Sequence, residues 1–139
     1  MPEVVENRFA GWTALTPVFH SLLRMVAAAA FMMHGTMKIF AWPAPVMPGA
    51  GTMPLASQAG VAGLLETIGG ALLLAGLFTR PVAFLLAGEM AVAYFQMHFP
   101  NGFWPAMNGG ELAVLYCFIW LFYSAAGAGP WSLDAMRRK

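Results

Sequence analysis

The chain has 139 residues, of which 60% are hydrophobic and only 9% are charged, and its formal net charge is +1. A soluble domain usually carries about 25% charged residues, so this composition predicts an integral membrane protein and gives no support to nucleic-acid binding. Cys117 is the only cysteine, which excludes an internal disulfide and a CxxC redox pair.

Four apolar segments follow one another along the chain. Each has about 18–25 residues, the length that a helix needs to cross a hydrocarbon core of about 30 Å. The first segment begins too late and is too long for a signal peptide, so we expect an uncleaved span. The predicted fold class is all-α, an integral membrane bundle of four transmembrane helices in a single domain over residues 1–139. The expected spans cover residues 18–42, 55–78, 81–99 and 110–127.

The distribution of Lys and Arg predicts the orientation of this bundle. If both termini are cytoplasmic, only Lys38 lies near the outer face, and five basic residues lie inside: Arg8, Arg80, Arg137, Arg138 and Lys139. Cytoplasmic segments of membrane proteins carry such an excess of positive charge. We therefore expect both termini to be cytoplasmic.

The first apolar segment carries three basic side chains on one side. At about 100° per residue, Arg24, His34 and Lys38 fall within a sector of roughly 80°. Ionised groups at this depth are costly unless other protein faces them, so partner helices should supply acids. The later segments offer three candidates: Glu66, Glu89 and Glu111. We expect Arg24 to form a structural ion pair with Glu66 or Glu89, because an unpaired buried guanidinium is too costly.

Four polar residues are expected to lie close together near the outer face: His34, Lys38, His98 and Glu111. A histidine that titrates near neutrality beside a carboxylate can carry protons to or from a reduced quinone. In this hypothesis His34 and Lys38 hydrogen-bond the carbonyl oxygens of a quinone cofactor, and Glu111 relays protons. The catalytic candidates are His34, His98 and Glu111. The structural alternative is an interfacial ion pair of Lys38 with Glu111 and no chemistry.

Haem and metal are weaker alternatives for the same residues. His34 and His98 could ligate a haem between two helices, but they form the one pair available and no HxxH spacing occurs. Both histidines with Glu111 would also suit a metal that takes two imidazoles and one carboxylate. We expect neither haem nor a metal.

The third apolar segment carries polar residues on two faces. Glu89 and His98 are nine positions apart, which places them about half a turn out of phase on a straight helix. The His98 face is small and aromatic, so it is the better interior, and Glu89 and Gln96 should point outward. A carboxylate at membrane depth is protonated or matched by other protein. This face is therefore expected to contact a partner membrane subunit or a second copy, unless a kink turns Glu89 inward to Arg24.

Several short stretches match one family pattern in combination: Leu23-Arg24 with His34-Gly35 and Lys38, Leu65-Glu66 with Gly69-Gly70, Gly76 to Arg80, Ala93-Tyr94 with His98, Gly109 to Leu112, and Trp131 to Asp134. Through these pieces, nearly all of the chain after Thr16 resembles the DoxX family of small four-helix membrane proteins. The resemblance implies a multi-pass protein of the bacterial inner membrane and a role as a quinone-linked oxidoreductase subunit. Glu89 lies outside the pattern.

Two functions are carried forward from the sequence. The first is the membrane subunit of a quinone-linked oxidoreductase or electron-transfer complex, with a polar cavity near the outer face. The chain shows no redox centre of its own, so a partner or a soluble substrate would supply electrons. The second is a non-catalytic accessory subunit that stabilises a larger membrane complex through the Glu89 and Gln96 face. A transporter is a weaker third function, because so few spans would need to oligomerise.

Overall fold

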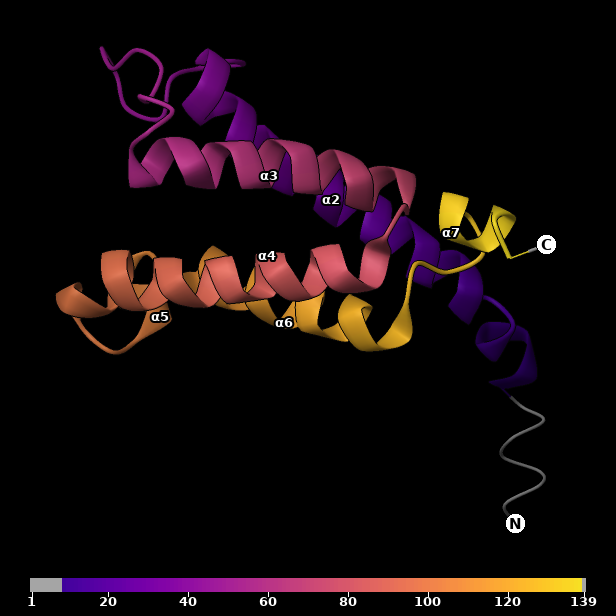
Figure 1. Cartoon of the computed structure of the whole chain (residues 1–139). Helices are drawn as coiled ribbons and strands as arrows, with labels where there is room; N and C mark the ends of the chain where they lie inside the picture. Colours follow the sequence, from indigo (N-terminus) through magenta and orange to yellow (C-terminus); the bar gives the residue numbers. More distant parts are fainter. Residues whose placement is uncertain (1–8, 139) are drawn as a thin grey trace.

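The computed structural model describes residues 9–138, and all the regular structure in this range is helical (Figure 1). The four long helices are α2 (Thr16–Phe40), α3 (Gln58–Ala75), α4 (Thr79–Ala93) and α6 (Glu111–Ala126). The short elements are the π-helix η1 (Tyr94–His98), the 3-10 helix η2 (Phe99–Asn101), α5 (Pro105–Asn108) and α7 (Leu133–Met136). The all-α prediction is confirmed for these residues.

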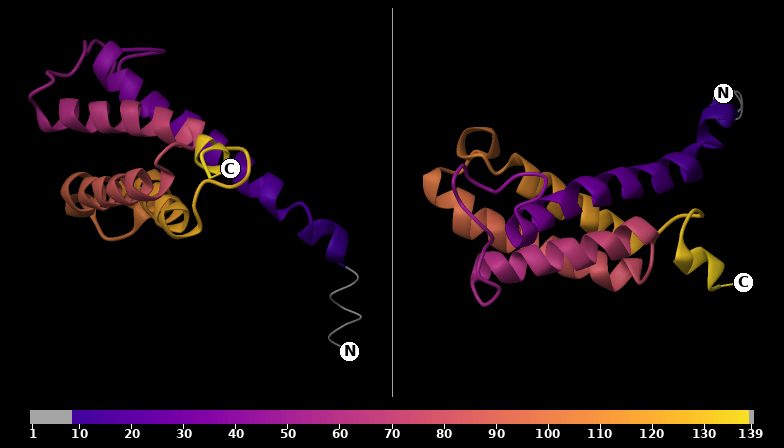
Figure 2. Two further views of the ribbon diagram at one scale, coloured as in Figure 1. Left: turned by 45° about the vertical axis from the view of Figure 1, so that its right-hand side comes forward. Right: turned by 90° about the horizontal axis from the view of Figure 1, so that it is seen from above.

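Three helical stretches are long and apolar enough to cross a membrane: Phe9–Phe40, Gln58–Ala75 and Thr79–Asn101. The fourth apolar helix, α6, has 16 residues, which corresponds to about 24 Å and falls short of a full hydrocarbon core. The described ends of the chain lie on the same side of the bundle (Figures 1 and 2). The cytoplasmic location of the termini stays a prediction, and Arg8 and Lys139, on which it partly rests, lie outside the described residues.

The four long helices form two pairs, α2 with α3 and α4 with α6, which lie side by side in the views of Figures 1 and 2. Glycines allow the close approach within the first pair. A Cβ added to Gly35 would lie 2.5 Å from the Thr67 nitrogen, and one added to Gly70 would lie 2.9 Å from Met32 Cα. Small residues of this kind let membrane helices approach backbone to backbone.

Aromatic side chains join the two pairs at the centre of the bundle. The Phe31 ring of α2 meets the rings of Tyr116 and Trp120 of α6 edge to face, with centroids 5.0 and 5.4 Å apart. Phe31 and Trp120 are fully or almost fully buried. Leu86 of α4 packs on the bare backbone of Gly69 in α3. These contacts fix one pair against the other along the middle of the helices.

The C-terminal segment folds back over one end of the bundle. The Asp134 backbone N–H donates to the Gly76 carbonyl at 2.9 Å, and the Asp134 carboxylate accepts from the backbone N–H groups of Phe78 and Thr79, each at 2.9 Å. A carboxylate there satisfies amide groups that the start of a helix leaves without partners. Asp134 therefore acts as the N-terminal cap of α4 from a distant part of the chain and holds α7 against the α3–α4 turn.

Candidate functional site

Arg24 is completely buried in α2, and its guanidinium donates to backbone carbonyls. Nε reaches the Ala128 carbonyl at 2.8 Å, and Nη1 reaches the carbonyls of Leu73 and Leu74 at the end of α3. Nη2 donates to the Trp131 carbonyl. The expected ion pair of Arg24 with Glu66 or Glu89 is therefore corrected: carbonyls at the ends of α3 and α6 take the place of an acid. Arg24 ties the C-terminal segment to the bundle.

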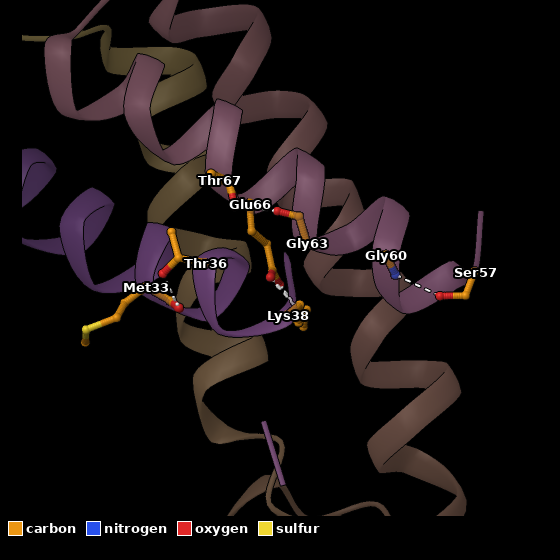
Figure 3. A network of polar contacts seen from close by, with 8 residues as sticks. All are labelled: Met33, Thr36, Lys38, Ser57, Gly60, Gly63, Glu66 and Thr67. Carbon is orange, nitrogen blue, oxygen red and sulfur yellow. Dashed lines mark hydrogen bonds and ion pairs between the residues drawn. The ribbon is translucent and has the colours of Figure 1, made fainter. Parts of the chain in front are cut away.

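Lys38 and Glu66 form the ion pair that the structure contains within residues 9–138. Lys38 Nζ donates to Glu66 Oε1 at 2.7 Å and to Oε2 at 2.6 Å (Figure 3). Glu66 is 3% exposed, whereas the Lys38 side chain is 22% exposed. The alternative in which Lys38 pairs with Glu111 is wrong, because the Lys38 ammonium is bound to Glu66 and Glu111 is exposed at the start of α6.

The helix packing explains why this pair forms. A Cβ on Gly63 would lie only 2.9 Å from Lys38 Cβ, so α3 approaches α2 closely one turn before Glu66. The Gly63 carbonyl also accepts a hydrogen bond from the Thr67 hydroxyl, one turn further along α3, at 2.7 Å (Figure 3). The close approach brings the lysine stem across the face of α3 and places its ammonium on the Glu66 carboxylate.

A groove of about 680 Å³ lies between α3 and α4, and its walls are mostly apolar. Seven large apolar side chains form these walls: Val61, Leu65, Phe84, Leu85, Met90, Val92 and Met97. Four polar residues also line it: Lys38, Gln58, Glu66 and Glu89. The side-chain amides of Gln58 and Gln96 hydrogen-bond each other and link the start of α3 to η1. An apolar slot with a few convergent polar groups is typical of small-molecule sites.

Glu89 is the one acid in this groove whose carboxylate lacks a partner. Both oxygens are buried, and neither has a hydrogen-bond partner among residues 9–138. The carboxylate lies within electrostatic range of Glu66 and Lys38. Glu89 therefore faces the groove between α3 and α4. It does not contact Arg24, whose guanidinium is bound to backbone carbonyls. A buried polar group without a partner marks a place where a ligand could supply one.

The end of the third apolar stretch departs from an α-helix. Residues Tyr94–His98 form a π-helix, which inserts extra residues into a turn and so changes which face the following residues occupy. His98 Nδ1 lies 3.2 Å from the Asn108 carbonyl, and Tyr94 donates its hydroxyl hydrogen to the Phe103 carbonyl. His98 thus contacts the end of α5, and Tyr94 contacts the loop after η2. The straight-helix geometry expected for Glu89 and His98 does not apply across this segment.

The four residues expected near the outer face do not form one hydrogen-bonded site. His34 is exposed, and its ring lies edge-on to Tyr116 with centroids 6.4 Å apart. Lys38 is bound to Glu66, and His98 contacts the Asn108 carbonyl at the end of α5. Glu111 is exposed. Of the four, Lys38 lines the groove. Within the described residues, no group of three or more His, Cys, Asp or Glu side chains could hold a metal ion.

The groove combines features that suit an amphipathic molecule with a polar head. Lys38 supplies a donor and a positive charge, Glu66 holds that ammonium in place, and Glu89 supplies an acceptor that can also take a proton. In a medium of low dielectric these groups act more strongly than in water. The sequence indicated Lys38, Glu66 and Glu89 as separate candidates. Their grouping in one groove depends on how the helices pack, and the glycines around Glu66 were the one sequence signal for that packing.

The model of the DoxX family matches residues 19–99. A Haemophilus influenzae protein described as uncharacterized is 44% identical over 123 residues, which cover 85% of this chain and 90% of that protein. No solved structure matches the chain. The family match spans more than half of the residues and includes Arg24, Lys38, Glu66 and Glu89, so this chain belongs to the DoxX family of membrane proteins.

Proposed function

We propose that this chain is the membrane subunit of a quinone-linked electron-transfer complex in the bacterial inner membrane, and that it binds the head group of a quinone or quinol in the α3–α4 groove. The observation that carries the proposal is the Glu89 carboxylate, which is buried in an apolar groove without a partner. A quinol presents hydroxyl donors on an apolar ring, so its chemistry complements both the acceptor and the walls.

The residues of the groove have distinct roles in this proposal. Glu89 accepts a hydrogen bond from one hydroxyl of the quinol and takes its proton. The ammonium of Lys38 donates a hydrogen bond to the oxygen on the opposite side of the quinol ring. Glu66 positions Lys38 through the two contacts at 2.6 and 2.7 Å. A bound quinone would supply the two-electron, two-proton chemistry, with electrons exchanged with a partner subunit or a soluble substrate.

This proposal moves the site away from the residues expected near the outer face. Lys38 is common to both sites, whereas His34, His98 and Glu111 lie outside the groove lining. Glu111 is therefore useful as a control, because it is an exposed acid on another helix. The same Glu-to-Gln change at Glu89 and at Glu111 distinguishes the groove from the outer residues.

The test measures binding of decylubiquinone and decylubiquinol to purified protein by thermal shift and by equilibrium dialysis. Glu89→Gln should weaken quinol binding about 10-fold or more, as expected when a charge-assisted hydrogen bond is lost. Glu111→Gln should bind as the wild type does. Equal affinities of all three proteins would contradict the groove site, and a loss confined to Glu111→Gln would return the site to the outer residues.

A second candidate function is an accessory subunit whose groove receives a helix of a partner protein. The observation that favours it is the run of exposed apolar side chains beside the groove, where Phe84 and Leu85 are 67% and 55% exposed. A polar side chain of the partner would then meet Glu89. In this case Glu89→Leu and Phe84→Ala should each weaken co-purification of the same membrane protein. The wild type should not bind decylubiquinol.

A further inference from the structure

A second hollow lies at the end of the bundle where α3 turns into α4. It has a volume of about 310 Å³ and is lined by residues of the turn, of α4 and of the C-terminal segment. Three arginines line it: Arg80, Arg137 and Arg138. Asp134 is the single acid in the lining, so the hollow carries an excess of positive charge.

The contacts of these side chains leave a net positive charge in the hollow. Asp134 already accepts from the Phe78 and Thr79 amides as the cap of α4. Arg80 donates to the carbonyls of Ser124 and Ala125 at the end of α6, which are neutral. The Arg137 guanidinium lies 5.0 Å from the centre of the Phe78 ring. The structure thus contains an arginine-lined hollow that suits an anion.

The location of the hollow indicates which kind of anion fits. The turn connects two helices that are long and apolar enough to cross a membrane, so it lies at a membrane–water boundary. Trp131 is 52% exposed at the same end, as is typical of residues at that boundary. Pro81 lines both this hollow and the apolar α3–α4 groove, so the two meet there. A charged hollow that continues into an apolar groove fits an amphiphile with an anionic head.

We propose that this hollow binds the phosphate of an anionic membrane phospholipid, with an acyl chain lying past Pro81 along the apolar side of α4. Guanidinium groups recognise phosphate through charge-assisted hydrogen bonds. Basic pockets between membrane helices bind anionic head groups in this way. The phosphate site is separate from the proposed position of the quinol head group, because Glu89 lies about 12 Å beyond Pro81 along α4.

The experiment uses the full chain in zwitterionic nanodiscs and in detergent, with dioleoyl-phosphatidylglycerol as the probe. Native mass spectrometry should show phosphatidylglycerol retained in preference to dioleoyl-phosphatidylcholine. The double variant Arg137→Gln/Arg138→Gln should bind phosphatidylglycerol roughly 30-fold more weakly, because it lacks the attraction of two basic side chains to the anionic lipid and each contributes a similar share of the affinity. The matched variant Arg137→Lys/Arg138→Lys should recover most of the affinity. Arg80 is left intact because it also holds the end of α6.

Three further measurements decide the outcome. The melting temperature of the double variant in pure phosphatidylcholine should stay within a few degrees of that of the wild type, because Arg137 adds only a surface charge to the Asp134 cap; this shows that folding is intact. Inorganic phosphate and glycerol 3-phosphate at millimolar concentration should not displace the lipid, because they lack the acyl chain. Displacement by either would assign the hollow to a free phosphate compound and overturn the lipid proposal. Equal retention of the two lipids, or an unchanged affinity of the double variant, would overturn it as well.

Discussion

Arg24 and Glu89 are both ionisable residues within apolar helices, yet their surroundings differ completely. Arg24 is 0% exposed, and its guanidinium donates to four backbone carbonyls. Glu89 presents two buried oxygens that have no partner among residues 9–138 and face a groove of about 680 Å³. The Arg24 guanidinium is hydrogen-bonded within the protein, whereas the Glu89 carboxylate is left able to bind a ligand.

The difference separates structural from functional roles among the intramembrane charges. A buried donor whose bonds are all made rigidifies the fold, and its removal leaves carbonyls without partners. A buried acceptor whose bonds are not made contributes nothing to the fold and is available to a ligand. The Lys38–Glu66 pair lies between these cases, because it is fully bonded but borders the groove.

Replacement of Arg24 should have the largest effect on stability. Arg24→Met leaves the carbonyls of Leu74, Ala128 and Trp131 without the donor that they have in the wild type, whereas the Leu73 carbonyl keeps the Gly76 N–H at 3.2 Å. Each buried polar group without a partner costs about 1–3 kcal/mol. We expect the free energy of unfolding to fall by more than about 3 kcal/mol. Unfolding in mixed micelles followed by circular dichroism measures this loss, and limited proteolysis should show the C-terminal segment released first.

The control for Arg24 concerns its supposed acidic partner. If an acid compensated Arg24, the double variant Arg24→Met/Glu66→Gln would recover stability relative to Arg24→Met. Because the guanidinium contacts carbonyls, we expect no recovery, and the two losses should add within about 0.5 kcal/mol. A recovery larger than about 0.5 kcal/mol would show that Arg24 and Glu66 form an ion pair.

Breaking the Lys38–Glu66 pair should have the next largest effect. Glu66→Gln leaves a lysine without its counter-charge in a half-buried position, and we expect a loss of about 1–3 kcal/mol. The double variant Lys38→Met/Glu66→Gln should regain part of that loss, since it removes both charges. A double-mutant cycle by thermal unfolding measures the coupling, and a coupling near zero would show that the pair does not stabilise the fold.

Helix formation was predictable because it depends on local properties. Apolar length and composition identified the four long helices, and the predicted segment 55–78 encloses α3 at Gln58–Ala75. Pro and Gly between the predicted segments indicated where the helices end, but α4 begins at Thr79, two residues before the expected start at residue 81. These signals lie within a few residues of the structure they specify.

The polar contacts were less predictable because they depend on partners far apart in the chain. The carbonyls of Leu73 and Trp131 have no side-chain signature, so an acid was expected for Arg24. Depth along straight helices placed Lys38 level with Glu111, but the approach of Gly63 brought it to Glu66. The π-helix at Tyr94–His98 shifted the faces of the third stretch, and nothing in periodicity anticipated it. Quinone binding, a partner subunit and the inner-membrane location stay predictions.

The cap supplied by Asp134 should give a smaller effect that depends on pH. Burial alone would raise its pKa, but hydrogen bonds from the Thr79 and Phe78 amides and the nearby Arg137 hold the pKa below its usual value. The stability it contributes is therefore fully present above the unfolded-state pKa of about 4 and is lost as the pH falls through the lower folded-state value. Asp134→Asn should cost about 1 kcal/mol at neutral pH.

Acid titration of unfolding checks the assignment to Asp134. The wild type should lose its advantage over Asp134→Asn as the pH falls below about 4, so the two stability curves converge there. Curves that stay parallel across this range would show that the carboxylate charge does not support the cap. The neighbouring Ser132 accepts from the Ala135 amide at 3.1 Å, and Ser132→Ala serves as a control whose loss should not depend on pH.

The smallest effect on stability is expected at Glu89, and it tests the comparison with Arg24 most sharply. Both residues carry a buried ionisable group, but removal of a carboxylate without partners breaks no hydrogen bond. Glu89→Leu also adds apolar contact with the groove walls, near Leu65 and Phe84. We expect its free energy of unfolding to equal that of the wild type or to exceed it by about 1 kcal/mol. Thermal unfolding without ligand measures this value, and decylubiquinol should then stabilise the wild type but not the variant. A marked loss of stability in Glu89→Leu would show that Glu89 supports the fold as Arg24 does.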